Sequence, residues 1–420
     1  MRKQRLLGCG AYIFLLSLSA YPADWPQWRG PGRNGVSLET GLLKEWPKQG
    51  PRLAWQAKDI GDGYSTPSVV GNRIYVLSNR GLDNEFVQAL SARDGTQIWA
   101  TKLGKVGNPN QSPRFPTARS TPTTDGDVLY ALGSDGDLAC VETAGGRIRW
   151  RRSLREDFGG HPGAWAYSES PLVDGDALVV TPGGPQATIV ALNKKTGETI
   201  WKSAVPGGDD AAYASVVIVE TGVRKQYVQF LARGLVGVDA KTGQFLWRYD
   251  GTGKGIINVP SPVARDGYVY SSQDRGPGGL VRLAAAGQGV TAEQVYLQRG
   301  LPNRIGGSLV LSGTLYGTVA EGLIAADWVT GKVLWQDASV GPGAVLAAEN
   351  RLYIHSEEGE VILLEATPQA YQEKGRFMPP DRPKRTRIAS EKAWAYPVVA
   401  NGHLYIRELE SLWSYDISGR

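Results

Sequence analysis

The sequence predicts an all-β protein, an eight-bladed β-propeller built from four-stranded antiparallel blades. Three observations support this fold class. An eleven-residue pattern ending in tryptophan recurs along the chain, a strand–turn–strand pattern precedes it, and the 420 residues include 54 glycines and 25 prolines. Frequent glycine and proline favour short strands joined by tight turns. Hydrophobic residues make up 41% and charged residues 21%, which is typical of a globular chain and not of a disordered one.

The first residues have the features of a secretory leader, and we assign residues 1–23 to a signal peptide. Three cations within the first five residues precede an apolar run over 6–19, and small residues follow. Cleavage after Ala20 and cleavage after Ala23 both fit the pattern. Because the apolar run is too short to anchor the chain across a bilayer, we expect an exported protein, either periplasmic or secreted.

The composition of the mature chain limits the classes of partner. Removal of the leader leaves 43 Lys and Arg against 41 Asp and Glu, so the formal net charge falls from +5 to +2. This small excess gives little support for a nucleic-acid partner. Only Cys140 remains in the mature chain, so no intrachain disulfide forms and the fold depends on its core. We expect a monomer without a transmembrane anchor.

The recurring pattern has the form of a β-hairpin. It begins as "ALSARDGTQIW" at 89–99 and recurs as "CVETAGGRIRW", "ALNKKTGETIW", "GVDAKTGQFLW" and "AADWVTGKVLW". Its first residue is small, its seventh is glycine and its eleventh is tryptophan. Glycine supplies the positive φ of a tight turn, and a large tryptophan opposite a small residue lets neighbouring units interlock. The structural repeat residues are therefore Gly95, Trp99, Gly146, Trp150, Gly197, Trp201, Gly243, Trp247, Gly331 and Trp335.

A strand–turn–strand unit, such as "STPSVVGNRIYVLS" at 65–78, precedes each hairpin, so each complete unit predicts a four-stranded sheet. The gap between Trp247 and Trp335 is about twice the usual spacing, and Tyr296 takes the place of a missing tryptophan between them. The number of units predicts eight blades, with seven as the alternative. They begin near residues 65, 120, 170, 214, 261, 308, 344 and 395.

The last unit stops after its third strand, which indicates how the ring closes. We expect residues 52–56 to pair with 412–417 and complete the last blade, because closure removes exposed sheet edges. The preceding "DWPQWRGPGRNGV" then lies across the seam, with Trp25 and Trp28 buried against the first and last blades. The predicted domains are the signal peptide at 1–23, an N-terminal strap at 24–51 and the propeller at 52–420.

The hairpin pattern resembles the tryptophan-docking repeat of propellers of the pyrroloquinoline-quinone (PQQ) type. That family includes quinoprotein alcohol dehydrogenases and the BamB outer-membrane assembly lipoproteins. The opening "DWPQWRGPGRNGVS", followed by "LAWQ", resembles the N-terminal stretch of secreted PQQ-like repeat proteins. The resemblance covers 24–420 and implies the propeller fold, but a fold does not by itself imply an activity.

The resemblance also implies a test for the quinone site of the dehydrogenases, where PQQ lies on a calcium ion near the axis. Arg119 stands where the family has an arginine. However, 112–122 contains no cysteine pair, Gly183 and Gly184 replace the acidic calcium ligand, and 229–236 holds neither Asn nor Asp. We therefore expect no cofactor and no metal, and PQQ with calcium is the alternative.

Residues just before each innermost strand are expected to line the mouth of the central channel. Aromatic faces, two arginines and one carboxylate around a depression suit a sugar, a peptide segment or an aromatic acid. In the alternative interpretation, the tyrosines fill the axis and hydrogen-bond one another. The candidate ligand-binding residues are Tyr64, Arg119, Tyr167, Glu169, Tyr213, Asn258, Arg304, Trp394 and Tyr396.

From these features we predict an exported, non-catalytic scaffold that binds a ligand, such as a glycan, or a protein partner in the cell envelope. The sequence shows no nucleophile elbow and no phosphate-binding loop. One alternative is a quinoprotein-type dehydrogenase of alcohols or sugars. Another alternative is a BamB-like role in outer-membrane assembly. The sequence has no well-placed lipoprotein box for the lipid anchor that would hold such a protein at the membrane, which counts against this alternative.

Overall fold

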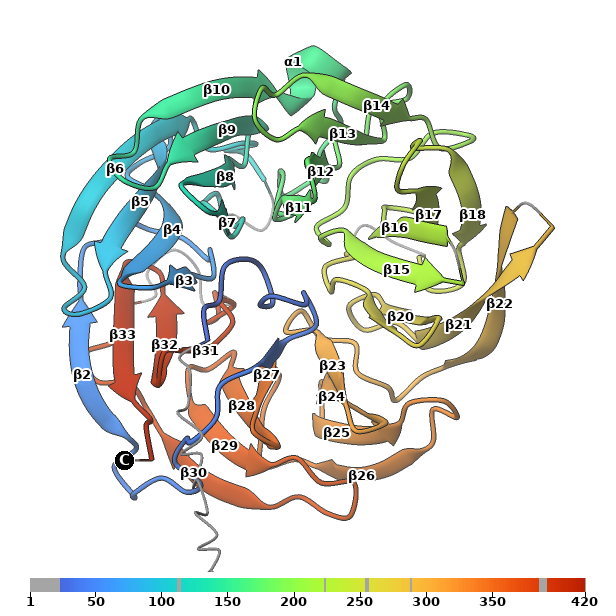
Figure 1. Ribbon diagram of the computed structural model, residues 1–420. Coiled ribbons are helices and arrows are strands. Elements are labelled where there is room, and N and C mark those ends of the chain that lie inside the picture. The colour runs from blue at the N-terminus through green and yellow to red at the C-terminus, as the bar shows by residue number, and fades with distance from the viewer. Residues whose placement is uncertain are drawn as a thin grey trace, which may run out of the picture.

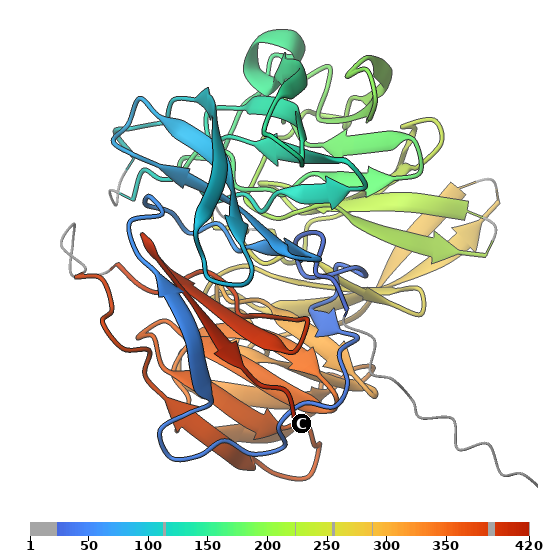
Figure 2. The same ribbon diagram turned by 60° about the vertical axis from the view of Figure 1, so that its left-hand side comes forward.

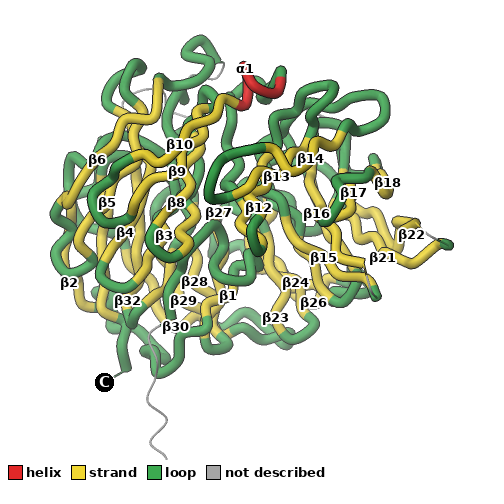
Figure 3. The backbone as a smooth tube through the Cα atoms, turned by 45° about the horizontal axis from the view of Figure 1, so that its top comes forward, coloured by secondary structure: helices red, strands yellow, loops and turns green. Residues whose placement is uncertain are grey.

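The computed structural model describes residues 23–111, 115–222, 224–253, 257–287, 289–384 and 391–419. The predicted signal peptide lies outside these residues except for Ala23. The described chain forms a ring of eight antiparallel sheets around a central axis (Figure 1), which confirms the predicted fold class and the count of eight blades. Figure 3 shows strands and loops throughout, with one short helix, α1 (Leu154–Phe158), after the second blade.

The first four blades each contain four consecutive strands, ordered from the axis outward. Blade 1 contains β3 (Ser68–Val70), β4 (Arg73–Asn79), β5 (Glu85–Ser91) and β6 (Gln97–Gly104). Blade 2 contains β7 (Thr123–Asp125), β8 (Val128–Leu132), β9 (Asp137–Glu142) and β10 (Ile148–Ser153). Blade 3 contains β11 (Leu172–Asp174), β12 (Ala177–Val180), β13 (Ile189–Asn193) and β14 (Thr199–Ser203). Blade 4 contains β15 (Val217–Thr221), β16 (Arg224–Phe230), β17 (Leu235–Asp239) and β18 (Phe245–Tyr249).

The other four blades include the closing blade. Blade 5 contains β19 (Val263–Arg265), β20 (Tyr268–Ser272), β21 (Gly278–Ala286) and β22 (Gly289–Gln298). Blade 6 contains β23 (Ser308–Leu311), β24 (Thr314–Val319), β25 (Gly322–Asp327) and β26 (Val333–Asp337). Blade 7 contains β27 (Gly343–Ala348), β28 (Arg351–Ser356), β29 (Val361–Glu365) and β30 (Glu373–Phe377). Blade 8 contains β31 (Val398–Ala400), β32 (His403–Glu408), β33 (Ser411–Asp416) and, outermost, β2 (Arg52–Ala57).

Strand β2 closes the ring as predicted. It pairs antiparallel with β33, with Arg52 opposite Asp416 and Ala57 opposite Leu412. Figure 2 shows the two strands side by side, although they come from opposite ends of the chain. The closing edge is therefore paired along its whole length, which removes the exposed strand edge that an open ring would leave.

The tryptophans interlock neighbouring blades. Trp201 lies opposite the small Ala191 within its own blade, and its indole Nε1 donates to the carbonyl oxygen of Ala240 in the next blade at 3.3 Å. Trp150 packs in the same way against Gly197 of blade 3, which has a φ of +74°. A Cβ atom at Gly197 would lie 2.9 Å from the Trp150 ring. Glycine is required there both for the turn and for the close approach of the indole.

Two blades depart from the repeat in different ways. In blade 5, Tyr296 lies opposite Leu280 at the tryptophan position, as predicted, and its hydroxyl donates to the Trp328 carbonyl oxygen at 3.2 Å. In blade 7 the tryptophan position holds Gly375. Trp46 of the N-terminal segment packs against that glycine, and its ring contacts Phe377 at a centroid distance of 5.4 Å. The strap thus supplies the aromatic ring that blade 7 lacks.

The strap, residues 24–51, crosses one end of the propeller axis (Figure 1). Trp25 is buried and forms an antiparallel bridge with Val69 of blade 1. Arg33 donates to the carbonyl oxygens of Ser170 and Pro171 at the start of blade 3. The short strand β1 (Val36–Ser37) pairs parallel with β27 at the inner edge of blade 7. The strap is therefore hydrogen-bonded to blades on opposite sides of the ring; it starts near the axis and continues to the outer edge of blade 7, where Trp46 packs.

Candidate functional site

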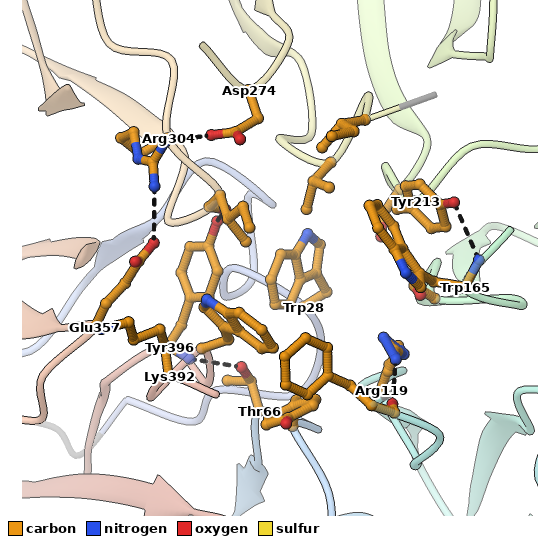
Figure 4. Close-up of a pocket in the computed structure, with 18 of the residues that line it drawn as sticks. Trp28, Thr66, Arg119, Trp165, Tyr213, Asp274, Arg304, Glu357, Lys392 and Tyr396 are labelled. Carbon is orange, nitrogen blue, oxygen red and sulfur yellow. Dashed lines mark hydrogen bonds and ion pairs between the residues drawn. The ribbon is translucent and has the colours of Figure 1, made fainter. Parts of the chain in front are cut away.

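A cavity of about 500 Å³ opens on the axis beside the strap (Figure 4). We call it the axial pocket; its lining includes Trp28, Tyr64, Arg119, Trp165, Arg304 and Trp394. In an antiparallel meander, the start of the first strand and the turn between the second and third strands lie at the same end of the sheet. Both sets of loops therefore reach this pocket, and the strap adds Trp28. The volume lies within the range of small-ligand sites.

Six of the nine predicted site residues line the axial pocket. They come from blades 1, 2, 4, 6 and 8, which shows that residues in equivalent loop positions meet at the axis. The tyrosine hydroxyls do not bond one another: that of Tyr64 donates to Glu391 at 2.6 Å, that of Tyr396 donates to the Ile305 carbonyl at 3.1 Å, and that of Tyr213 accepts from the Trp165 backbone N–H at 3.2 Å. The axis is therefore not filled by a cluster of mutually bonded tyrosines. The six residues are Tyr64, Arg119, Tyr213, Arg304, Trp394 and Tyr396.

Three predicted residues point elsewhere and do not line the pocket. The Tyr167 hydroxyl donates to the Pro182 carbonyl at 2.8 Å inside the core between blades 2 and 3. Glu169 accepts from the backbone N–H of Thr181 and, at 3.1 Å, from the side chain of Gln229. Each lies next to a lining residue in sequence, and because successive side chains in an extended segment alternate in direction, they face the blades.

Asn258 is also buried away from the pocket. Its side-chain amide donates to the Leu231 carbonyl oxygen at 2.7 Å and to the Ala232 carbonyl oxygen at 2.9 Å. Its neighbours Ile257 and Val259 line the pocket in its place. The predicted amide at this wall is thus replaced by an apolar surface.

Several lining residues were not predicted from the sequence. Trp28 comes from the strap, where we expected burial against the first and last blades; its ring contacts Tyr396 of blade 8, but its indole Nε1 donates to Ser261 of blade 5 at 3.0 Å. Phe115, Trp165 and Lys392 lie in the long loops between blades, while Asp274 and Glu357 lie in turns between second and third strands. The turns between second and third strands lie at the same end of each blade as the loops before the first strands, so the topology alone could have predicted that both contribute lining residues.

Seven aromatic side chains belong to the lining of the axial pocket. Trp394 contacts Phe115 at a centroid distance of 4.8 Å and Tyr64 at 5.0 Å, both edge to face. On the opposite side, Trp165 lies 5.4 Å from Tyr213 at an interplanar angle of 40°. Arg119 lies over the Tyr64 ring and is held by Gln111 and the Phe115 carbonyl. These packed rings give the site a rigid, largely apolar surface.

One side of the pocket is charged. The Arg304 guanidinium lies between two carboxylates, 2.8 Å from Asp274 and 3.7 Å from Glu357 (Figure 4). Burial raises the pKa of both carboxyls above their usual values, and the positive charge of Arg304 opposes that shift. Arg275 also reaches Asp274, at 3.4 Å. This wall therefore presents both hydrogen-bond donors and acceptors in a partly desolvated setting.

The residues present do not fit a calcium-held quinone. Calcium prefers six to eight oxygen ligands, yet both carboxylates of this wall are engaged by Arg304, whose positive charge occupies the space between them. Gly183 and Gly184 lie close to backbone atoms of neighbouring loops and do not line the pocket. Within the described ranges, no group of three His, Cys, Asp or Glu side chains is arranged to hold a metal ion.

No helix of the described chain is long and apolar enough to cross a membrane.

A family model described as outer membrane protein assembly factor BamB matches residues 36–164, 83–316 and 164–372. The BamB of Alkalilimnicola ehrlichii is 32% identical over 140 residues, which is 33% of this chain and 32% of that protein. The BamB of Yersinia pestis is 26% identical over 304 residues, 69% of this chain and 68% of that one. The first of these matches spans only about a third of the relative's length.

Among solved structures, the quinohemoprotein alcohol dehydrogenase ADHIIG of Pseudomonas putida HK5 aligns with a TM-score of 0.66 at 16% identity. The alignment covers 95% of this chain and 81% of that one. At this identity the likeness concerns the fold alone. The comparisons therefore agree with the propeller architecture. The role of the axial pocket has to be inferred from the residues that line it.

Proposed function

We propose a non-catalytic binding function for this chain, which belongs to the family of PQQ-repeat propellers described as outer membrane protein assembly factor BamB. The observation that carries the proposal is the axial pocket, a cavity of about 500 Å³ with an aromatic wall, a charged wall and Trp28 of the strap facing it. The chain is exported by its N-terminal leader and acts in the cell envelope. There the propeller holds a ligand or a segment of a partner at its axis.

The geometry supports binding better than chemistry. A general base needs a carboxylate that is available to a reacting proton, whereas Asp274 and Glu357 are tied to one arginine. The ring is expected to be rigid because indole and tyrosine hydrogen bonds, such as those of Trp99, Trp150 and Tyr296, join neighbouring blades, and because the strap is hydrogen-bonded to several blades. A preorganised pocket loses little entropy when it binds, which favours affinity.

Binding to an envelope fraction tests this function. We expect the mature protein, immobilised, to retain a specific component that Trp165→Ala and Arg119→Ala reduce at least tenfold, because both side chains line the pocket. The matched controls are Ile98→Ala in β6 and Arg282→Ala in β21, which remove an exposed apolar and an exposed charged side chain away from the pocket. Equal retention by pocket and control variants would show that the pocket is not the binding site.

A second candidate is assembly of outer-membrane proteins, favoured by the family match. In that case the retained component is a protein of the assembly machinery. Mass spectrometry of the component retained by wild type and lost from Trp165→Ala separates a protein partner from a glycan. A retained component that contains no protein would contradict a role in outer-membrane protein assembly.

A further inference from the structure

Three tryptophans are half-buried in the axial pocket: Trp28 from the strap, Trp165 from blade 3 and Trp394 from blade 8. Trp28 meets Tyr396 at 68° and Trp165 meets Tyr213 at 40°, so neither indole is stacked flat on its neighbour. Their rings therefore keep apolar surface that a ligand can cover. A ligand suited to this wall has flat, apolar faces of about the size of one ring.

The charged wall adds a second requirement. Arg304 supplies donors, while Asp274 and Glu357, although paired with Arg304, keep further lone pairs that can accept hydrogen bonds from a ligand. Thr66, Ser168 and Ser215 also belong to the lining, and a hydroxyl both donates and accepts. The ligand must therefore carry several groups that donate and accept hydrogen bonds at its edge. Sugar hydroxyls meet this requirement, whereas a plain aromatic acid offers acceptors only.

The balance of charge adds a third requirement. Four cations line the pocket against two carboxylates, and one of the four, Lys392, also pairs with Glu358 just outside the lining, so a formal excess of one positive charge remains; the cations are Arg119, Arg275, Arg304 and Lys392. Arginine forks match carboxylate geometry. A ligand with one or two carboxylates is therefore favoured over a neutral one and over a cation.

Shape separates a sugar chain from a peptide. An extended peptide is commonly held by main-chain bonds along a strand edge or a groove. Here the cavity lies on the propeller axis, and Trp28 of the strap is part of its lining. The inner edge strand of blade 7, β27, is already paired with β1 and is not open to an extended peptide. A cavity at the axis, without an open strand edge, is suited to the end of a sugar chain and not to an extended peptide.

We propose that the axial pocket binds the end of an acidic oligosaccharide, a chain of sugar rings that carry carboxylates. Ring faces pack on Trp28, Trp165 and Trp394, hydroxyls bond to the charged wall, and a carboxylate pairs with the cations. This inference rests on the proposed binding function and specifies its ligand class. The strap is then part of the site, because it contributes Trp28.

Isothermal titration calorimetry of the mature protein tests the proposal with three probes of equal length: a galacturonate trimer, a neutral galactose trimer and an acidic tripeptide with a central phenylalanine. We expect the galacturonate trimer to bind at least tenfold more tightly than the other two. Trp165→Ala and Lys392→Gln should each weaken it at least tenfold, while Ile98→Ala and Arg282→Gln leave it unchanged. Higher salt should weaken it, because charge pairing contributes.

Several outcomes overturn the proposal: no binding of the galacturonate trimer, equal binding of the neutral trimer, a preference for the tripeptide, or no effect of the pocket variants. If the trimer fails but Trp165→Ala still loses the envelope component, the ligand class is wrong and the binding function stands. If Trp165→Ala also keeps the envelope component, both proposals fail together.

Discussion

Alanine in place of Gly197 tests whether the indole interlock stabilises the ring, and Gly313 provides a matched control. Both glycines have positive φ, +74° and +79°. Alanine in that conformation costs about 1 kcal/mol. At Gly313 a Cβ meets nothing within 4 Å, so we expect a total loss of about 1 kcal/mol in the free energy of unfolding.

At Gly197 the same Cβ lies 2.9 Å from two atoms of the Trp150 ring, well inside contact distance. The indole must shift, which weakens its 3.1 Å hydrogen bond to the Lys194 carbonyl oxygen. Overpacking of this kind costs a further 1–3 kcal/mol or so, which gives a total of about 3 kcal/mol for Gly197→Ala.

Guanidinium unfolding followed by circular dichroism measures both losses. In a Trp150→Ala background, we expect Gly197→Ala to cost only about 1 kcal/mol, because the ring it displaces is gone. Equal losses for Gly197→Ala and Gly313→Ala would refute the interlock. An unchanged loss for Gly197→Ala in the Trp150→Ala background would refute it as well.

Three further predictions concern the strap, a buried carboxylate and the quinone. Trp25→Ala should lower the free energy of unfolding by about 3–5 kcal/mol, because this 2% exposed ring packs between the first and last blades; an unchanged denaturation midpoint would contradict this. Burial raises the pKa of Glu169 from 4.5 to about 7, so the folded chain keeps a proton that the unfolded chain releases, and stability falls as pH rises between those values. Relative to wild type, Glu169→Gln should therefore gain stability across that window, by up to about 3 kcal/mol above pH 7, and parallel melting temperatures from pH 4 to 8 would contradict it. Finally, PQQ with calcium should not be retained after gel filtration, and a stoichiometric quinone spectrum with dye-linked alcohol turnover would restore the dehydrogenase alternative.

The repeat made the architecture predictable because each blade carries its own local signal. Glycine at the turn and tryptophan at the end of the hairpin constrain backbone and packing within eleven residues, so they are visible without knowledge of distant contacts. Even the divergent blade 5 kept an aromatic side chain, Tyr296, at the interlocking position. In blade 7 the replacement, Trp46, comes from about 330 residues away in the chain, which no local pattern indicates.

The site was predictable only in part, for a related reason. Loop positions before the innermost strands identified Tyr64, Arg119 and Trp394, but alternation along an extended segment sends Glu169 into the blades. The path of the strap decides where Trp28 lies, and that path depends on hydrogen bonds to many blades at once. Such a long-range arrangement is not encoded in any single stretch of sequence.

Photocrosslinking from inside the pocket tests whether a ligand binds at the propeller axis. A benzophenone amino acid placed at Ile257, in the pocket, is compared with the same group at Lys241, on an exposed turn of blade 4. In cells that export the protein, we expect an adduct from position 257 that disappears when Trp165→Ala is added, and no such adduct from position 241. Equal adducts from both positions, or none from position 257, would contradict a binding site at the propeller axis.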